Sequence, residues 1–151
     1  MSDDGAALKD TQTHDNLKAA FSAESQAAAR YRYFAVRAEI DGNLALAGLF
    51  KAAAAAEATQ AHGSLDYLST VGDPQTNTRV GTSDLNLQSA VEREVYRHET
   101  LYASFAQTAR EEGFDKIANW FEALARAGEA QAAAFKEALD NLDAGDVAGR
   151  D

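Results

Sequence analysis

Apolar residues recur every three or four positions along most of the chain, which is the spacing of one face of an α-helix. The pattern forms four long blocks that are separated by residues typical of helix ends. These blocks cover residues 15–39, 43–70, 83–113 and 115–142. Two connections are tight, and the third, between the second and third blocks, is long and polar. The pattern predicts an all-α fold in which two helical hairpins, joined by a long crossover, form an antiparallel four-helix bundle.

The length of 151 residues suits one domain with a core of its own. We predict the bundle over residues 13–142, with a flexible segment at residues 1–12 and a flexible tail at residues 143–151. The first residues are polar and lack the apolar core of a signal peptide, and no apolar run is long enough to span a membrane. We therefore expect a cytoplasmic protein. The formal net charge of −10 argues against nucleic acid and anionic membranes as partners.

The two predicted hairpins repeat each other in sequence. Residues 34–61 recur in part 71 places later, whereas residues 16–24 recur in part only 70 places later. The third block therefore carries one extra residue between Glu94 and Phe105. A single insertion into a continuous helical pattern predicts a π-bulge, and such bulges often lie at functional sites. The alternative interpretation is random drift in a weak repeat.

The inward face of each predicted helix is apolar at both ends and small or polar in its middle. The middle segments of the four helices lie at similar distances from the tight turns along the bundle axis. They therefore predict one polar layer across the core. Its members are Glu24, Glu57, Gln60, Glu94, Arg97 and Gln131. Carboxylates that face one another in a core are costly unless a cation neutralises them. In helical bundles the usual solution is a pair of metal ions held by inward-pointing glutamates and histidines.

Three segments resemble the rubrerythrin family of the ferritin-like superfamily. They are NLKAAFSAESQAAARYRYFA at residues 16–35, the GLF and AEATQAHG segments of the second helix, and FAQTAREEGFDKIANWFEALARA at residues 105–127. The resemblance covers roughly residues 12–142 and implies a ferritin-like bundle that binds two iron ions and reduces hydrogen peroxide. It also implies electrons from a rubredoxin-like centre. Many members carry that centre at the C-terminus, and this chain ends without it and has no cysteine.

The resemblance implies seven metal-ligand positions, and this chain keeps only some of them. Three positions keep a glutamate, namely Glu24, Glu57 and Glu94. At the other four, Gln60 and Gln131 stand where the family has histidine, and Arg97 and Gly128 stand where it has glutamate. An amide is a weak neutral ligand, and arginine is always charged and cannot coordinate a metal. The resemblance therefore implies a degenerate diiron site.

These substitutions fit one another as a metal-free hydrogen-bonded network. A guanidinium at Arg97 replaces part of the lost positive charge beside two or three carboxylates. Gly128 removes a side chain and makes room for the long arm of Arg97, and the two glutamines can donate to carboxylates. Two alternatives stay open. In one the glutamates are protonated relics, and in the other a rewired metal site uses Glu24, Glu57, Glu94 and His98.

Two functions follow from these interpretations. The first is a metal-free, non-catalytic protein that binds a protein partner, assembles or regulates; it has no cofactor and no catalytic residue. The second is a metal-binding oxidoreductase of the peroxidase or oxidase type, with one or two iron or manganese ions in the rewired, carboxylate-rich site. We favour the first, and we expect a homodimer with an unidentified protein partner, because alanine-rich helices suit close contact between helices.

Overall fold

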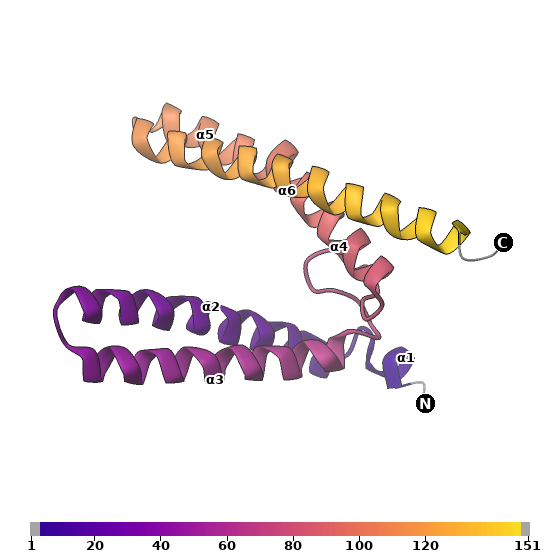
Figure 1. Cartoon of the computed structure of the whole chain (residues 1–151), viewed down its shortest axis with the longest axis horizontal. Coiled ribbons are helices and arrows are strands. Elements are labelled where there is room, and N and C mark those ends of the chain that lie inside the picture. Colours follow the sequence, from indigo (N-terminus) through magenta and orange to yellow (C-terminus); the bar gives the residue numbers. More distant parts are fainter. Residues whose placement is uncertain (1–3, 149–151) are drawn as a thin grey trace. The chain divides into compact units, whose positions relative to one another are not determined.

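The structure is a computed structural model and describes residues 4–148. Within this range the chain is helical and contains no strand (Figure 1). The elements are α1 (Asp4–Leu8), α2 (Gln12–Ile40), α3 (Leu44–Leu68), α4 (Ser83–Tyr96), the π-helix η1 (Arg97–Leu101), α5 (Tyr102–Glu111) and α6 (Asp115–Ala148). The predicted all-α class is therefore confirmed.

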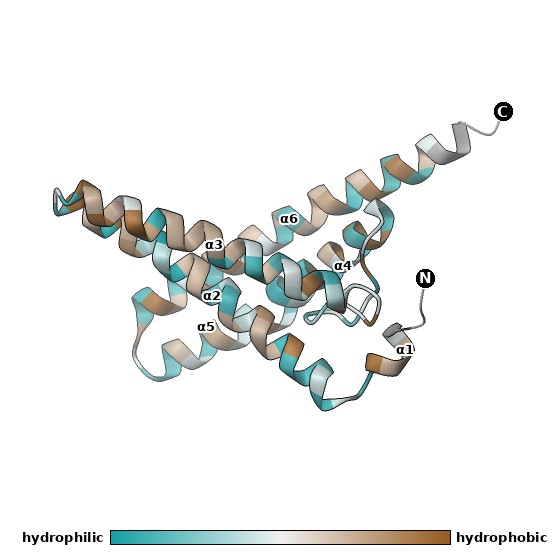
Figure 2. Ribbon diagram, turned by 90° about the horizontal axis from the view of Figure 1, so that it is seen from below, coloured by the Kyte–Doolittle hydropathy of each residue, from teal (hydrophilic) through white to brown (hydrophobic). Residues whose placement is uncertain are grey.

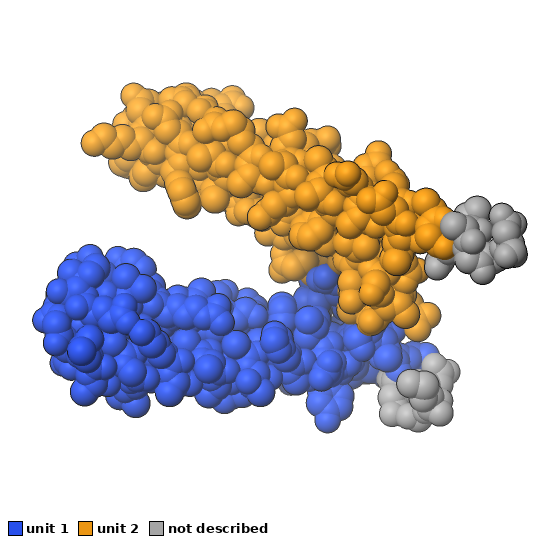
Figure 3. Space-filling view, viewed as in Figure 1, with its two compact units in different colours: residues 1–74 blue, residues 75–151 orange. Residues whose placement is uncertain are grey.

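The chain divides into two compact units, Met1–Pro74 and Gln75–Asp151 (Figure 3). The first unit is built on the antiparallel pair α2 and α3, and in the second α4, η1 and α5 pack along α6. Hydrophilic and hydrophobic residues alternate along the helices of both units (Figure 2), as expected where one face of a helix packs on its neighbour. Both predicted hairpins are thus present.

The two tight turns share one geometry. Gly42 and Gly113 have φ values of 78° and 85°, in the left-handed region that glycine adopts without strain. The N–H of each glycine donates to the carbonyl three residues earlier, at 3.0 Å in both turns. The N–H of the following residue donates to the carbonyl five residues earlier, at 2.9 Å and 2.7 Å. This is the pattern of a Schellman motif, and it explains why a glycine follows the first helix of each hairpin.

Alanines make the closest packing within the hairpins. In α3 the buried residues follow one another every seven positions, as Ala47, Ala54, Ala61 and Leu68. Ala28, Ala35 and Ala38 are the buried residues of α2. A spacing of seven keeps a seam on one face of a helix along its whole length. The small side chains allow the two backbones to approach closely.

Each hairpin also carries three aromatic rings in contact, at positions that differ by 71. They are Tyr31, Phe34 and Phe50 in the first hairpin, and Tyr102, Phe105 and Phe121 in the second. The Phe34–Phe50 ring centroids are 5.4 Å apart at 65°, and those of Phe105 and Phe121 are 5.4 Å apart at 62°. The repeat seen in the sequence is therefore a repeat of structure.

The insertion predicted between Glu94 and Phe105 lies where the chain forms a π-helix. The element η1, Arg97–Leu101, separates α4 from α5 in the third long helix. A π-turn accommodates one residue more than an α-helix without breaking the helix. This explains why the repeat is 70 residues before η1 and 71 after it, and the π-bulge prediction is confirmed.

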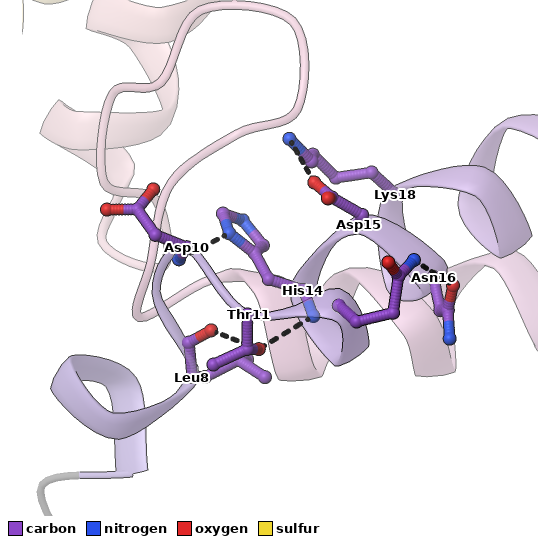
Figure 4. Close-up of polar contacts among 8 residues, drawn as sticks. Leu8, Asp10, Thr11, His14, Asp15, Asn16 and Lys18 are labelled. Atoms are coloured by element: carbon purple, nitrogen blue, oxygen red, sulfur yellow. Dashed lines mark hydrogen bonds and ion pairs between the residues drawn. The ribbon is translucent and has the colours of Figure 1, made fainter.

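The first long helix begins earlier than its predicted start near residue 15. Thr11 is the N-cap of α2, and its Oγ1 accepts a hydrogen bond from the N–H of His14 at 3.1 Å while donating to the carbonyl of Leu8 at 2.6 Å (Figure 4). The imidazole Nδ1 of His14 accepts from the N–H of Asp10 at 3.3 Å (Figure 4). The cap and these bonds start α2 at Gln12 and connect it to α1.

The last helix is longer than predicted. We placed its end near Leu142, but α6 continues to Ala148, and residues 149–151 lie outside the described range. Alanine favours helix, and the single Gly145 in this stretch costs a helix only about 1 kcal/mol, so the helix can continue through it. The other predicted ends lie within two residues of those observed. Along residues 4–148, no helix is long and apolar enough to cross a bilayer.

Candidate functional site

An ion pair lies at the junction of α4 and η1. Glu94, in the last turn of α4, is buried, with 9% of its surface exposed. Arg97 is the first residue of η1, and its Nη1 donates to both carboxylate oxygens of Glu94, at 2.9 Å to Oε1 and 2.8 Å to Oε2. The two side chains are 11% and 20% exposed. A buried carboxylate is thus neutralised by a guanidinium from the next turn of its own helix.

Local helical geometry brings these two side chains together. Residues three apart in a helix lie on the same face, so Arg97 can reach Glu94 without leaving a helical conformation. The guanidinium carbon of Arg97 also lies 5.3 Å from the ring centroid of Tyr102, the first residue of α5. This is the distance of a cation–π contact. Arg97 is therefore held on one side by a carboxylate and on another by an aromatic ring.

The environment keeps Arg97 charged. Its burial disfavours the charge and acts to lower the pKa, but the hydrogen bond to Glu94 and the negative charge of that carboxylate act in the opposite direction, and Tyr102 adds to them. The net effect is a raised pKa of Arg97. Arginine is already cationic at every pH at which proteins are normally folded. The positive charge at this position is therefore permanent.

Gly128 of α6 lies directly against this ion pair. A Cβ atom at this position would lie 3.3 Å from the carbonyl oxygen of Glu94, 3.3 Å from Cβ of His98 and 3.4 Å from Oε2 of Glu94. These distances are tight for a methyl group, so glycine permits the close approach of α6 to the third long helix. We predicted that Gly128 makes room for the arm of Arg97. The three atoms nearest to this position belong to Glu94 and His98, and the role of Gly128 in making room for Arg97 stays a prediction.

Three other features complete the second hairpin's part of the site. Oε1 of Gln131, on α6, lies 3.5 Å from Nη1 of Arg97, at the outer limit of a hydrogen bond. His98 is half-buried in η1, with its Cβ toward Gly128. Nε of Arg97 is buried and has no partner among the described residues. The glutamine that replaces a family histidine therefore does contact Arg97, but as an acceptor, where we had predicted a donor to carboxylates.

The first hairpin satisfies one glutamate in a different way. The Oγ of Ser64, on α3, donates to Oε2 of Glu24, on α2, at 3.0 Å, and both residues are half-buried. Glu57 is half-buried and Gln60 is exposed. We had not assigned Ser64 a role in the sequence. The available signal was its position seven residues after Glu57, which places both residues on one face of the helix.

The structure thus assembles the predicted polar residues in two groups. The second hairpin brings Glu94, Arg97 and Gln131 together beside Gly128 and His98, and the first brings Glu24 to Ser64. The single layer that joins both groups stays a prediction. Within each hairpin, over the residues that the structure describes, no group of three or more histidine, aspartate and glutamate side chains is arranged to hold a metal ion.

Comparison with known proteins gives one consistent result. The family model described as Rubrerythrin matches residues 15–139. The chain belongs to the rubrerythrin family. It is 32% identical to the rubrerythrin of Nitratidesulfovibrio vulgaris in an alignment 145 positions long, which covers 93% of this chain and 75% of that protein. It is 32% identical to the rubrerythrin of Clostridium perfringens in an alignment 154 positions long with gaps, which covers 95% of this chain and 78% of that protein.

A third relative is the nigerythrin of Nitratidesulfovibrio vulgaris, which is 34% identical in an alignment 145 positions long that covers 89% of this chain and 69% of that protein. The family assignment also gives the fold class, because the rubrerythrin domain is a ferritin-like four-helix bundle. It matches the two antiparallel hairpins and the long crossover predicted from the sequence. Rubrerythrins usually bind iron, so the residues of this chain must be tested against such a site.

The residues around Glu94 do not fit a rubrerythrin diiron site. Both oxygens of its carboxylate lie within hydrogen-bond distance of Arg97, whose fixed positive charge would repel a metal cation at the same oxygens. The resemblance implies glutamates at positions 97 and 128, and neither is present. A longer side chain at position 128 would meet the backbone of Glu94 and the Cβ of His98. Geometry and charge at this end of the site therefore disfavour a metal.

Proposed function

We propose that this rubrerythrin-family protein is a metal-free, non-catalytic binding or regulatory protein of the cytoplasm, in which an ion pair takes the place of a metal ligand. The observation that carries the proposal is the contact of Arg97 Nη1 with both oxygens of Glu94, at 2.9 Å and 2.8 Å. The charge of a carboxylate that is held in this way is already neutralised, and each of its two oxygens already accepts a hydrogen bond.

The surrounding residues support the proposal. Gly128 leaves the space that the carboxylate of Glu94 occupies, and Gln131 lies against the guanidinium. Glu24 receives a hydrogen bond from Ser64, so this glutamate also has a partner within its own hairpin. Peroxide reduction by a diiron protein needs metal ions that stabilise charge on the substrate oxygens. A site with a permanent cation among its ligand positions has lost that capacity.

The experiment that tests the proposal is a count of bound metal. The protein is purified without a metal-binding tag, incubated in turn with Fe²⁺, Mn²⁺ and Zn²⁺, freed of excess metal and measured by mass spectrometry. We expect far less than one ion per chain, in a protein whose circular dichroism shows an intact helical fold. A stoichiometry close to two ions per chain, lost in the Glu57→Ala variant, would overturn the proposal.

A restored variant makes the test sharper. It combines Gln60→His, Arg97→Glu, Gly128→Glu and Gln131→His, which are the residues that the family resemblance implies. We expect this variant to bind metal where the parent does not. A control that carries the first, third and fourth substitutions but keeps Arg97 should bind much less. If the control binds as well as the full variant, then Arg97 is not what excludes metal.

A further inference from the structure

The two hairpins present the same residues where their helices pack most closely. The buried alanines of the first hairpin between residues 35 and 61 each recur as an alanine 71 places later, namely Ala35, Ala38, Ala47, Ala54 and Ala61 as Ala106, Ala109, Ala118, Ala125 and Ala132. Four of the five second copies are buried as well. The aromatic clusters and the glycine turns repeat in the same way. This packing surface, which we call the alanine seam, therefore does not distinguish one hairpin from the other.

One ion pair joins the two helices of each hairpin beside the seam, and the two pairs have opposite polarity. In the first hairpin, Lys51 of α3 pairs with Glu39 of α2. In the second, Nη2 of Arg110, on α5, lies 2.6 Å from Oε1 of Glu122, on α6. Glu39 and Arg110 are 71 positions apart, and so are Lys51 and Glu122. The same contact is thus made twice, with its acidic residue on the first helix in one hairpin and on the second helix in the other.

The change of sign is confined to these two positions. Between residues 34 and 61, three positions carry a charged aspartate, glutamate, lysine or arginine in both copies of the repeat. Asp41 keeps its sign, because its counterpart is Glu112. The other two, Glu39 and Lys51, both change sign, and they are the two that pair with each other. Because they change together, each hairpin keeps an attraction between its own helices.

The opposite polarity acts against an exchange of partners between the hairpins. If α2 packed its seam against α6, Glu39 would face Glu122 and also Asp115, which lies 3.8 Å from Arg110 in the native hairpin. If α5 packed its seam against α3, Arg110 would face Lys51. Both exchanged pairs place like charges together, whereas both native pairs place opposite charges together. Charges that flank an apolar seam select the partner of a helix in this way in coiled coils.

We infer that these two ion pairs are a pairing signal, which keeps each helix on the seam of its own hairpin when the chain folds. Incorrect assembly of similar units is a characteristic failure of repeated sequences. The short turns keep the two helices of a hairpin close, but they do not fix which faces of those helices meet. A single exposed ion pair contributes little to stability. An exchange of partners, however, loses two attractions and creates two repulsions, so four small contributions act in the same direction.

The test reverses the ion pairs without removing them. Glu39→Lys/Lys51→Glu reverses the first hairpin, so that both hairpins have the same polarity. Adding Arg110→Glu/Glu122→Arg reverses the second hairpin too and restores opposite polarity. The reference protein and both variants carry Asp115→Asn, because a glutamate at position 110 would otherwise lie near Asp115. All three proteins have the same net charge and one attractive pair in each hairpin, so the match between the hairpins is what differs.

The measurement follows the alanine seam directly. Each full-length protein is labelled with ¹³C in its alanine methyl groups, unfolded in urea, refolded by dilution and studied by two-dimensional NMR. We expect one set of seam signals from the reference and from the fourfold reversal. The twofold reversal should show a second set, populated at least about tenfold more than in the reference, since 1.4 kcal/mol shared among four contacts is sufficient. In 1 M NaCl, where charges are screened beyond about 3 Å, the three proteins should become alike.

The fourfold reversal is the decisive control. A twofold reversal with the same spectrum as the reference, or a fourfold reversal as heterogeneous as the twofold one, would overturn the inference. If the twofold reversal does not refold and the fourfold reversal does, the pairing signal is supported. If neither refolds, the inference is also overturned, because each hairpin already tolerates one of the two polarities and the reversal should be accepted.

Discussion

Replacing Arg97 by methionine tests whether the ion pair holds this part of the fold. Methionine keeps an unbranched apolar stem that can pack on Tyr102 but removes the guanidinium, so the carboxylate of Glu94 loses both hydrogen bonds. Removing one partner of a buried ion pair costs about 3–5 kcal/mol. The side chain of Arg97 is 20% exposed, and water can screen part of the loss, so we expect about 3 kcal/mol.

The measurement is urea unfolding followed by circular dichroism at 222 nm, with the slope m compared between variants. For a chain of this length, about 3 kcal/mol corresponds to a fall of roughly 6–12 °C in Tm. The exposed Arg126, also on a helix, provides the matched control, and Arg126→Met should change the unfolding free energy by no more than about 0.5 kcal/mol. An Arg97→Met protein as stable as this control would refute the reasoning.

A double-mutant cycle separates the ion pair from packing. Glu94→Gln and Arg97→Met are made singly and together, and we expect the double variant to be more stable than the sum of the single losses predicts, by about 2 kcal/mol. The pKa of Arg97 is raised, so its contribution is present at every pH below the ordinary arginine pKa and is lost only above it. The difference between parent and Arg97→Met should therefore be constant from pH 7 to pH 10.

Four further substitutions test other parts of the fold. Gly128→Ala should lower Tm despite the better helix propensity of alanine, because the new Cβ would lie 3.3 Å from a backbone oxygen. Gly63 has open space around it, so Gly63→Ala should instead raise the unfolding free energy by about 0.5–1 kcal/mol. Asp84→Asn should lower Tm at pH 7. The hydrogen bond from Thr82 is the main cause that lowers the pKa of Asp84, so its stabilisation is lost as the pH falls below 3.8, and in acid the two melts should coincide. Thr11→Ala removes the N-cap of α2 and should cost about 1 kcal/mol in urea unfolding.

The hairpins and the π-helix could be predicted from the sequence because each depends on residues close together in the chain. Helical periodicity located the long helices, and Gly42 and Gly113 marked the turns, since both positions need a positive φ. The change of the repeat from 70 to 71 residues located η1 without any structure. A count of residues is sufficient here, because an insertion in a continuous helix has few structural solutions.

The contacts between helices were harder to predict. The bond from Ser64 to Glu24 joins residues 40 places apart, and its formation depends on the rotation of two helices about their axes. In the same way, the neighbours of Gly128 are set by how closely α6 approaches η1, which a repeat pattern does not give. Spacing predicts which residues share one face of a helix, but a rotation of a few tens of degrees decides which atoms meet.

Glu24 and Glu94 each have a hydrogen-bond partner within their own hairpin, and the two partners differ in what they imply for metal binding. Glu24 takes a neutral donor from Ser64, and Glu94 takes a charged donor from Arg97. A serine hydroxyl can rotate away from a carboxylate at little cost, but a guanidinium keeps its charge wherever it moves. Adding histidines at positions 60 and 131 therefore supplies ligands without removing the cation that repels the metal. Metal binding should return only in variants in which Arg97 is also replaced.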